Sequence, residues 1–157
     1  MKLKGIRDED FTNYKKPSMY LAFPTCTFKC ERECGQKMCQ NSTLAITPDI
    51  AVDIDGLIQR YLSNPITSSI TCGGLEPLDS WDDLYEFIYN FRLKSNDDIV
   101  IYTGFYAHEV EDKLAQLQKF TNIVIKFGRF IPGQQPHYDE VLGIMLASDN
   151  QYAERIS

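Results

Sequence analysis

Four of the five cysteines in this 157-residue chain lie within fourteen residues, at Cys26, Cys30, Cys34 and Cys39. Thiolates at such short spacing in one loop can converge on a metal ion or an iron–sulfur cluster. Zinc prefers two close pairs of ligands, but only three residues separate Cys30 from Cys34, less than the usual hairpin of a zinc ribbon. A cluster held by four cysteines would carry electrons, and one held by three would leave an iron open to a substrate. The spacing alone leaves these alternatives open.

A second motif, Gly73-Gly74-Leu75-Glu76-Pro77, follows an expected strand. Glycine has no Cβ, so a ligand can approach its backbone closely, although the pattern alone indicates only a turn. Cys72 is expected to be a buried thiol at the strand end, because a free cysteine behaves as a small hydrophobe. His108 and His137 lie far from the cysteines, and we expect them on the surface or in a polar pocket rather than at a metal.

The composition indicates one globular domain over residues 1–157, with 43% hydrophobic and 24% charged residues. We expect a lead-in at 1–17 and a cluster-binding loop at 24–47. No run approaches the roughly 18 apolar residues of a membrane span, and a net charge of −6 argues against a nucleic-acid partner. With no secretory signal visible, we expect a cytoplasmic, reducing location, where clustered cysteines are more often metal or redox groups than disulfides.

The elements that must position these motifs alternate along the chain. Strands are expected at 18–23, 66–71, 98–102, 123–127 and 141–146, and helices at 48–62, after Ser80 and at 107–120, with Thr47 capping the first helix. This order predicts an α/β fold with a mainly parallel sheet, and the chain is too short for a complete eight-stranded barrel of about 250 residues. We therefore expect an open, partial (β/α) barrel. The cysteine loop, Gly73-Gly74 and Thr103-Gly104 all follow strands, at the edge where such sheets carry their sites.

A cysteine loop after the first strand, combined with Gly-Gly and Glu-Pro after the second, resembles the radical S-adenosylmethionine (SAM) superfamily. The resemblance implies that three cysteines hold a 4Fe–4S cluster whose open iron chelates the amino and carboxylate groups of SAM. An external donor reduces the cluster, and one electron from the reduced cluster then cleaves SAM to methionine and a 5′-deoxyadenosyl radical. It also implies that Gly73, Gly74 and Glu76 line the methionine amino group, although Leu75 separates the glycines from Glu76 by one residue.

Residues from roughly 18 to 152 resemble, more closely, the small activating enzymes of anaerobic ribonucleotide reductase. The segments that carry the likeness are Cys39-Gln40-Asn41, Ile101–Phe105, Phe127–Phe130 (with Phe127 replacing an acid) and Leu146–Gln151.

The family spacing is Cys-x3-Cys-x2-Cys, but position 33 is glutamate here, so the third ligand is Cys34 or Cys39. Gln40-Asn41 favours Cys39, which gives Cys-x3-Cys-x8-Cys and leaves Cys34 spare. The resemblance then implies Cys26, Cys30 and Cys39 as the catalytic cluster ligands. It implies that Asn41 braces the cluster loop and that Thr103 contacts the ribose or methionine side of SAM.

The resemblance implies an oxidoreductase that abstracts a hydrogen from a glycine Cα of the large anaerobic ribonucleotide reductase subunit, a glycyl-radical enzyme. So short a chain has little material to close a small-molecule pocket, and a partner's loop could exclude water instead. Two alternatives are the same chemistry on another glycyl-radical enzyme or a small molecule, and a non-catalytic four-cysteine zinc or electron-transfer module.

Overall fold

The centre of the protein is a mixed six-stranded sheet with the order β10-β7-β6-β5-β3-β2. The computed structural model describes residues 1–37, 39 and 41–157, so the Gln40 on which the choice of Cys39 partly rested lies outside the described residues. The strands of this sheet are β2 (Gly5–Asp10), β3 (Ser18–Phe23), β5 (Ser69–Gly74), β6 (Asp98–Tyr102), β7 (Ile123–Phe127) and β10 (Tyr152–Arg155).

The four inner strands, β3, β5, β6 and β7, are parallel, and the edge strands β2 and β10 are antiparallel to them. Phe23 pairs with Gly74, and Tyr102 pairs with Lys126. The carboxyl ends of the inner strands therefore meet along one edge of the sheet. The sheet is mixed rather than purely parallel, and its closure into a partial barrel stays a prediction.

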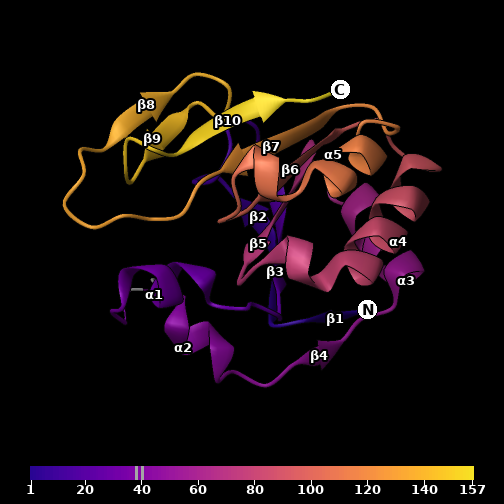
Figure 1. Ribbon diagram of the computed structural model, residues 1–157. Coiled ribbons are helices and arrows are strands. Elements are labelled where there is room, and N and C mark those ends of the chain that lie inside the picture. Colours follow the sequence, from indigo (N-terminus) through magenta and orange to yellow (C-terminus); the bar gives the residue numbers. More distant parts are fainter. Residues whose placement is uncertain (38, 40) are drawn as a thin grey trace.

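Helices cover one face of this sheet (Figure 1). They are α3 (Ile54–Leu62), α4 (Trp81–Arg92) and α5 (Glu111–Leu117), with the short 3-10 helices η1 (Pro77–Ser80) and η2 (Ala107–Glu109) before α4 and α5. Leu84, Phe87, Ile88 and Phe91 form the buried face of α4, and they pack with alternate residues of the inner strands into the main core. Burial of this apolar face stabilises the helical layer.

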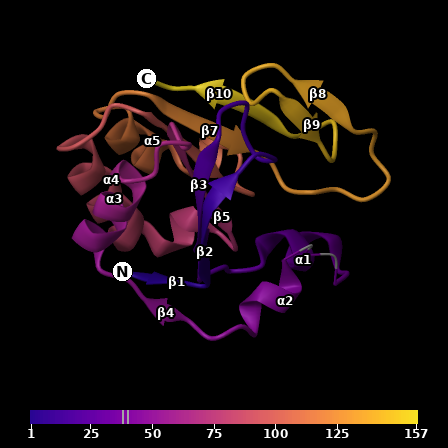
Figure 2. The same cartoon turned by 180° about the vertical axis from the view of Figure 1, so that it is seen from behind.

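A second, smaller core lies on the other face of the sheet. There Val100 of β6 and Val124 of β7 pack with Tyr14, Leu142 and Leu146. Seen from behind, the hairpin of β8 (His137–Asp139) and β9 (Ile144–Leu146) lies above the cysteine segment, which contains α1 (Lys29–Cys34) and α2 (Ser42–Ala45) (Figure 2). Both lie on the side of the molecule away from α3, α4 and α5.

Local sequence pattern predicted β3, β6 and β7 with the bounds that the structure shows. The helix expected at 48–62 begins later, at Ile54, and its N-cap is Asp53, whose carboxylate accepts the Gly56 N–H at 2.7 Å, rather than Thr47. The reason is a long-range pairing, because β4 (Ile50–Ala51) pairs with β1 (Lys2–Leu3). The strand expected at 66–71 is displaced to Ser69–Gly74, so it includes both glycines of the motif.

The terminal segments also differ from expectation. The expected lead-in at 1–17 contains β1 and β2, and β2 forms one edge of the main sheet. The helix expected at 107–120 is divided into η2 and α5, and of the strand expected at 141–146 only residues 144–146 pair. The sequence pattern missed β8 and β10, because such short strands depend on their partners more than on local propensity.

Among the described residues, no helix combines the length and apolar character needed to cross a bilayer.

Candidate functional site

The carboxyl ends of the parallel strands border a cavity of about 410 Å³. Its lining includes Gly73, Gly74 and Thr103 from the strand ends, and Cys30 and Cys39 from the cysteine loop. A second, smaller pocket of about 40 Å³ is lined by Cys26, Cys30 and Glu76 among others. The fold therefore brings the residues singled out in the sequence to one edge of the sheet, and Cys30 contributes to both spaces.

Cys26 and Cys30 lie in the segment that leaves β3. Cys26 accepts the backbone N–H of Phe28 at 3.2 Å, and Phe28 has a φ of 51°, which turns the chain into α1. Burial raises the pKa of Cys26 to about 12 and also raises the pKa of Cys30. The neighbouring thiols, Cys30 for Cys26 and Cys39 for Cys30, raise both pKa values further. The raised pKa values mean that Cys26 and Cys30 keep their protons more firmly than free thiols do, and binding of a metal would have to displace these protons.

Cys34 and Cys39 have different surroundings. Cys34 is exposed, and its sulfur lies 3.7 Å from the Glu31 carbonyl oxygen and 3.4 Å from that of Gln36. Cys39 is half-buried and lines the larger cavity together with Cys30, whereas Cys34 lines neither space. Geometry thus places Cys39, not Cys34, beside Cys30.

No group of three or more His, Cys, Asp or Glu side chains in the described part of the chain stands close enough to hold a metal ion. A 4Fe–4S cluster needs a wider spacing of its ligands than a single ion does, because each cysteine thiolate binds a different iron of the cluster. Cys30 lines both cavities, Cys26 lines the smaller one and Cys39 lines the larger one. A donor set of thiols around such a space fits an iron–sulfur cluster.

The two glycines are required by the packing of neighbouring strands as well as by the cavity. Gly74 has a φ of 87°, and a Cβ there would lie 2.8 Å from the backbone of Ala22 and Phe23. A Cβ on Gly73 would lie 2.6 Å from the Tyr20 hydroxyl oxygen, which accepts the Gly74 N–H at 2.6 Å. Side chains at these positions would therefore displace β5 from β3.

Asn41 connects the cysteine loop to this strand end. Its side-chain amide donates a hydrogen bond to the Gly74 carbonyl oxygen at 2.7 Å. Asn41 also lines the larger cavity beside Cys39. The side chain therefore holds the loop against the wall that the glycines form.

Glu76 joins the ends of β5 and β6. One carboxylate oxygen accepts the Leu78 N–H at 3.1 Å and the other accepts the Gly104 N–H at 2.8 Å. Burial raises the pKa of Glu76 to about 7, and hydrogen bonds from Gly104, Thr103 and Leu78 oppose that rise. A carboxylate oxygen can accept more than one hydrogen bond, and Glu76 lines the pocket to which Cys26 and Cys30 contribute.

Sequence reasoning missed two cationic residues, Lys126 and Arg129. Lys126 is 7% exposed, lines the larger cavity and donates to the Gly128 carbonyl oxygen at 2.7 Å. Burial lowers the pKa of Lys126 to about 8, and the charge of Glu76 opposes this shift. The sequence could have identified Lys126 as a candidate site residue, because it interrupts the apolar run 123–127 and lysine is rarely buried unless its charge has a partner. Arg129 lines both spaces.

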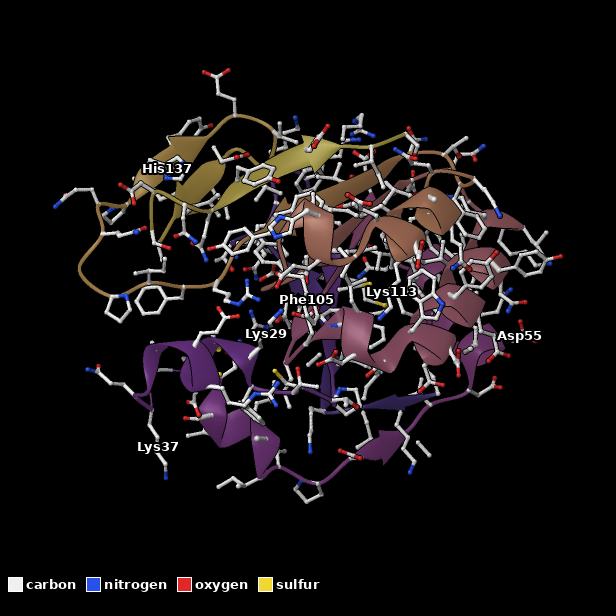
Figure 3. All side chains as sticks on the ribbon, in the orientation of Figure 1. Lys29, Lys37, Asp55, Phe105, Lys113 and His137 are labelled. Carbon is white, nitrogen blue, oxygen red and sulfur yellow. The ribbon has the colours of Figure 1, made fainter. Side chains whose placement is uncertain are left out.

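A network of charges docks the cysteine loop on the strand ends. Arg129 pairs with Glu33 at 3.1 Å and with Glu109 at 2.7 Å, and Lys29 also pairs with Glu109. Arg129 is the main cause that lowers the pKa of Glu109 to about 2. Figure 3 shows Lys29 beside Phe105 where the loop meets the sheet, and its ammonium lies 5.7 Å from the centre of that ring.

The remaining residues noted in the sequence lie outside the two cavities. Cys72 is fully buried in the main core, and burial raises its pKa. His108 is exposed and stacks on Tyr106, and His137 lies on β8, far from Lys29 (Figure 3). Phe127, which replaces an acid of the family resembled, is fully buried against Tyr152.

The segment that ends in Gln151 supports the end of β7. The Gln151 side-chain oxygen accepts the N–H groups of Ala147 and Ser148 at 3.1 and 3.2 Å, and its amide donates to the Gly128 carbonyl oxygen at 3.3 Å. Gln151 also lines the larger cavity.

A family model described as a 4Fe-4S single cluster domain matches residues 17–151. The match spans the cysteine loop, the four parallel strands and the β8–β9 hairpin. Comparisons with curated proteins and with solved structures give no match.

Proposed function

Because the chain belongs to the 4Fe-4S single cluster domain family, we propose that it is a radical SAM enzyme. The observation that carries the proposal is that two of the three thiols line a glycine-walled cavity and the third, Cys26, lines the smaller pocket, to which Cys30 also contributes. Cys30 and Cys39 line a space of about 410 Å³ together with Gly73 and Gly74, within the range of roughly 300–1,000 Å³ typical of small-molecule sites. A pure electron carrier has no need of such a space beside its cluster.

The residues have distinct roles in this proposal. Cys26, Cys30 and Cys39 hold the cluster, which when bound supplies the electron that cleaves SAM. The backbone of Gly73 and Gly74 borders the methionine end of SAM.

Lys126, Thr103 and Asn41 line the larger cavity, and Glu76 lines the smaller pocket that shares Cys30 with it. Glu76 faces the methionine amino group, and the ammonium of Lys126 balances the carboxylate. Thr103 contacts the ribose or methionine side, and Asn41 keeps the loop closed over it.

We further propose that the substrate is a glycine of the large anaerobic ribonucleotide reductase subunit, with an external one-electron donor. Met145 on the β8–β9 hairpin lines the cavity yet is exposed, and Tyr138 and Ile131 nearby in the chain are exposed as well. A partner that covers these apolar side chains would exclude water from the radical.

The test is anaerobic reconstitution with iron and sulfide, followed by addition of reductant and SAM. We expect the visible absorbance of a 4Fe–4S cluster, and methionine and 5′-deoxyadenosine as products by chromatography. Cys30→Ala is the matched negative variant. A well-formed cluster that exchanges electrons but never cleaves SAM would identify an electron-transfer module instead.

The partner is tested separately by adding the large reductase subunit and recording the electron paramagnetic resonance (EPR) signal of a glycyl radical. We expect the radical only when both proteins, SAM and reductant are present. Cleavage of SAM without that radical would redirect the proposal to another glycyl-radical enzyme or to a small molecule.

A further inference from the structure

Eight residues separate Cys30 from Cys39 in the sequence. Helix α1 ends at Gly35, which has a φ of 68° and donates its N–H to the Glu31 carbonyl oxygen. This left-handed turn reverses the chain after a single short helix. Cys39 is thereby carried back to the start of α1.

The side chain of Glu31 meets Cys39 there. One Glu31 carboxylate oxygen accepts the Cys39 backbone N–H at 3.0 Å. Because Glu31 follows Cys30 directly in the chain, this bond fixes Cys39 next to Cys30. On the other side of Cys39, the Asn41 amide binds the Gly74 carbonyl oxygen at 2.7 Å. Cys39 is therefore held from both sides.

We propose that Glu31 is the positioning residue that presents Cys39 as the third cluster ligand in this long spacing. A hydrogen bond to a carboxylate is stronger than one between neutral groups, which suits a loop whose helix α1 has no buried residue. The inference rests on the cluster part of the proposed function and is independent of SAM cleavage. Glu31 acts through the backbone of Cys39 and touches no reacting atom.

The three charged residues at 31, 32 and 33 provide an internal comparison. Glu33 pairs with Arg129 instead of Cys39. The Arg32 side chain is exposed and has no hydrogen bond or ion pair to any residue that the structure describes. Replacing Arg32 with methionine, the same residue that replaces Glu31, therefore controls for changes in helix α1 that do not involve Cys39.

The experiment uses the full chain, reconstituted anaerobically, with the variants Glu31→Met, Glu31→Gln and Arg32→Met. Glu31→Met keeps the length of the side chain but removes the acceptor, and Glu31→Gln keeps a carbonyl acceptor without the charge. Loss of the cluster to an iron chelator is followed by visible absorbance. Thiol alkylation during this loss is followed residue by residue by mass spectrometry.

We expect Glu31→Met to lose its cluster about 10- to 100-fold faster than the wild type, as for other residues that orient metal ligands. Cys39 should become alkylated before Cys26 and Cys30. Glu31→Gln should restore most of the retention, and Arg32→Met should match the wild type. A general loss of folding would instead expose the three thiols together, and circular dichroism would detect it.

Equal cluster retention in Glu31→Met and the wild type would overturn the inference. Equal losses in Glu31→Met and Arg32→Met would overturn it as well, as would a wild-type cluster that protects Cys34 and leaves Cys39 reactive. SAM is not added in any of these experiments, so their results do not depend on its cleavage. A protein that retains its cluster normally but fails to cleave SAM would count against the proposed function and leave the role of Glu31 standing.

Discussion

The two sides of the candidate site are held in place by different forces. The strand side belongs to the sheet, where Gly73 and Gly74 of β5 pair with β3 and every residue of β5 is buried. The cysteine side contains α1 and α2, neither of which has a buried residue. Figure 1 shows this segment apart from the layer of α3, α4 and α5.

Polar contacts hold the cysteine side to the strand side. They include the Asn41 bond to Gly74, the Arg129 pairs with Glu33 and Glu109, and the pair between Lys29 and Glu109. Glu33 and Lys29 are partly exposed, and pairs with such an exposed partner each contribute roughly 0–1 kcal/mol, whereas Arg129 itself is buried. The wall of the cavity therefore forms with the core, whereas the loop depends on weaker contacts and on the cluster itself. Variants on the two sides should fail in different ways.

The largest expected effect is the loss of the cluster in Cys30→Ala. Cys30 contributes to both cavities, so we expect no stable cluster and no cleavage of SAM, with little change in the free energy of unfolding of the cluster-free protein. Iron content, visible absorbance and urea denaturation measure these quantities.

Cys72→Ala is the matched variant on the strand side. It should bind the cluster but lose roughly 1–3 kcal/mol of stability, because a buried side chain is truncated. A stable cluster in Cys30→Ala would contradict the expectation that variants on the cysteine side lose the cluster while variants on the strand side lose stability.

A second prediction compares two glycines with positive φ. Gly74→Ala should destabilise the protein by roughly 2–4 kcal/mol, since the strained backbone is combined with overpacking against Ala22 and Phe23. Gly35 has a φ of 68° with nothing within 4 Å of an added Cβ, so Gly35→Ala should cost only about 1 kcal/mol. Chemical denaturation of the two cluster-free variants provides the test, and equal costs would refute it.

A third prediction uses the pH dependence of stability in the cluster-free protein. The pKa of Glu76 is raised from 4.5 to about 7 by burial, so the unfolded state releases this proton first as the pH rises. Glu76 should therefore reduce stability progressively between these two values, with a slope of at most about 1.4 kcal/mol per pH unit. Above the upper value its contribution is constant.

Glu76→Gln isolates this contribution. The difference in free energy of unfolding between Glu76→Gln and the wild type should shift in favour of the variant as the pH rises from 4.5 to about 7. Urea denaturation over a pH series measures this difference. Parallel stability curves for the two proteins would mean that Glu76 is not buried as described.

The smallest expected effect is that of Cys34→Ser. Cys34 is exposed and lines neither cavity, so stability should change by less than about 0.5 kcal/mol and cluster content should not change. Iron analysis and denaturation check both quantities. Loss of iron in this variant would assign Cys34 as the third ligand.

Local pattern in the sequence was sufficient for several parts of the fold and site. The runs of β3, β6 and β7 are readable as buried strands because they are short, continuous and apolar, and the apolar face of α4 is readable from its helical period. The cysteines, the glycine pair, Glu76 and Thr103 were singled out by residue type and by their place after strands, and their roles at the site stay predictions. Side-chain chemistry and local periodicity are properties of short segments, so the sequence carries them directly.

Other features exist only because distant segments meet. Strand β4 replaces the first turn of an expected helix because β1 pairs with it, and β10 becomes a strand by pairing with β7. Lys126 and Arg129 became site residues only when β7 was placed beside β6. Likewise, the spacing of the four clustered cysteines did not decide which of them is the third cluster ligand. In the structure, the turn at Gly35 and the hydrogen bond to Glu31 bring Cys39 close to Cys30, whereas Cys34 is exposed to solvent. Long-range contacts set these outcomes because their energy depends on partners that no local segment contains.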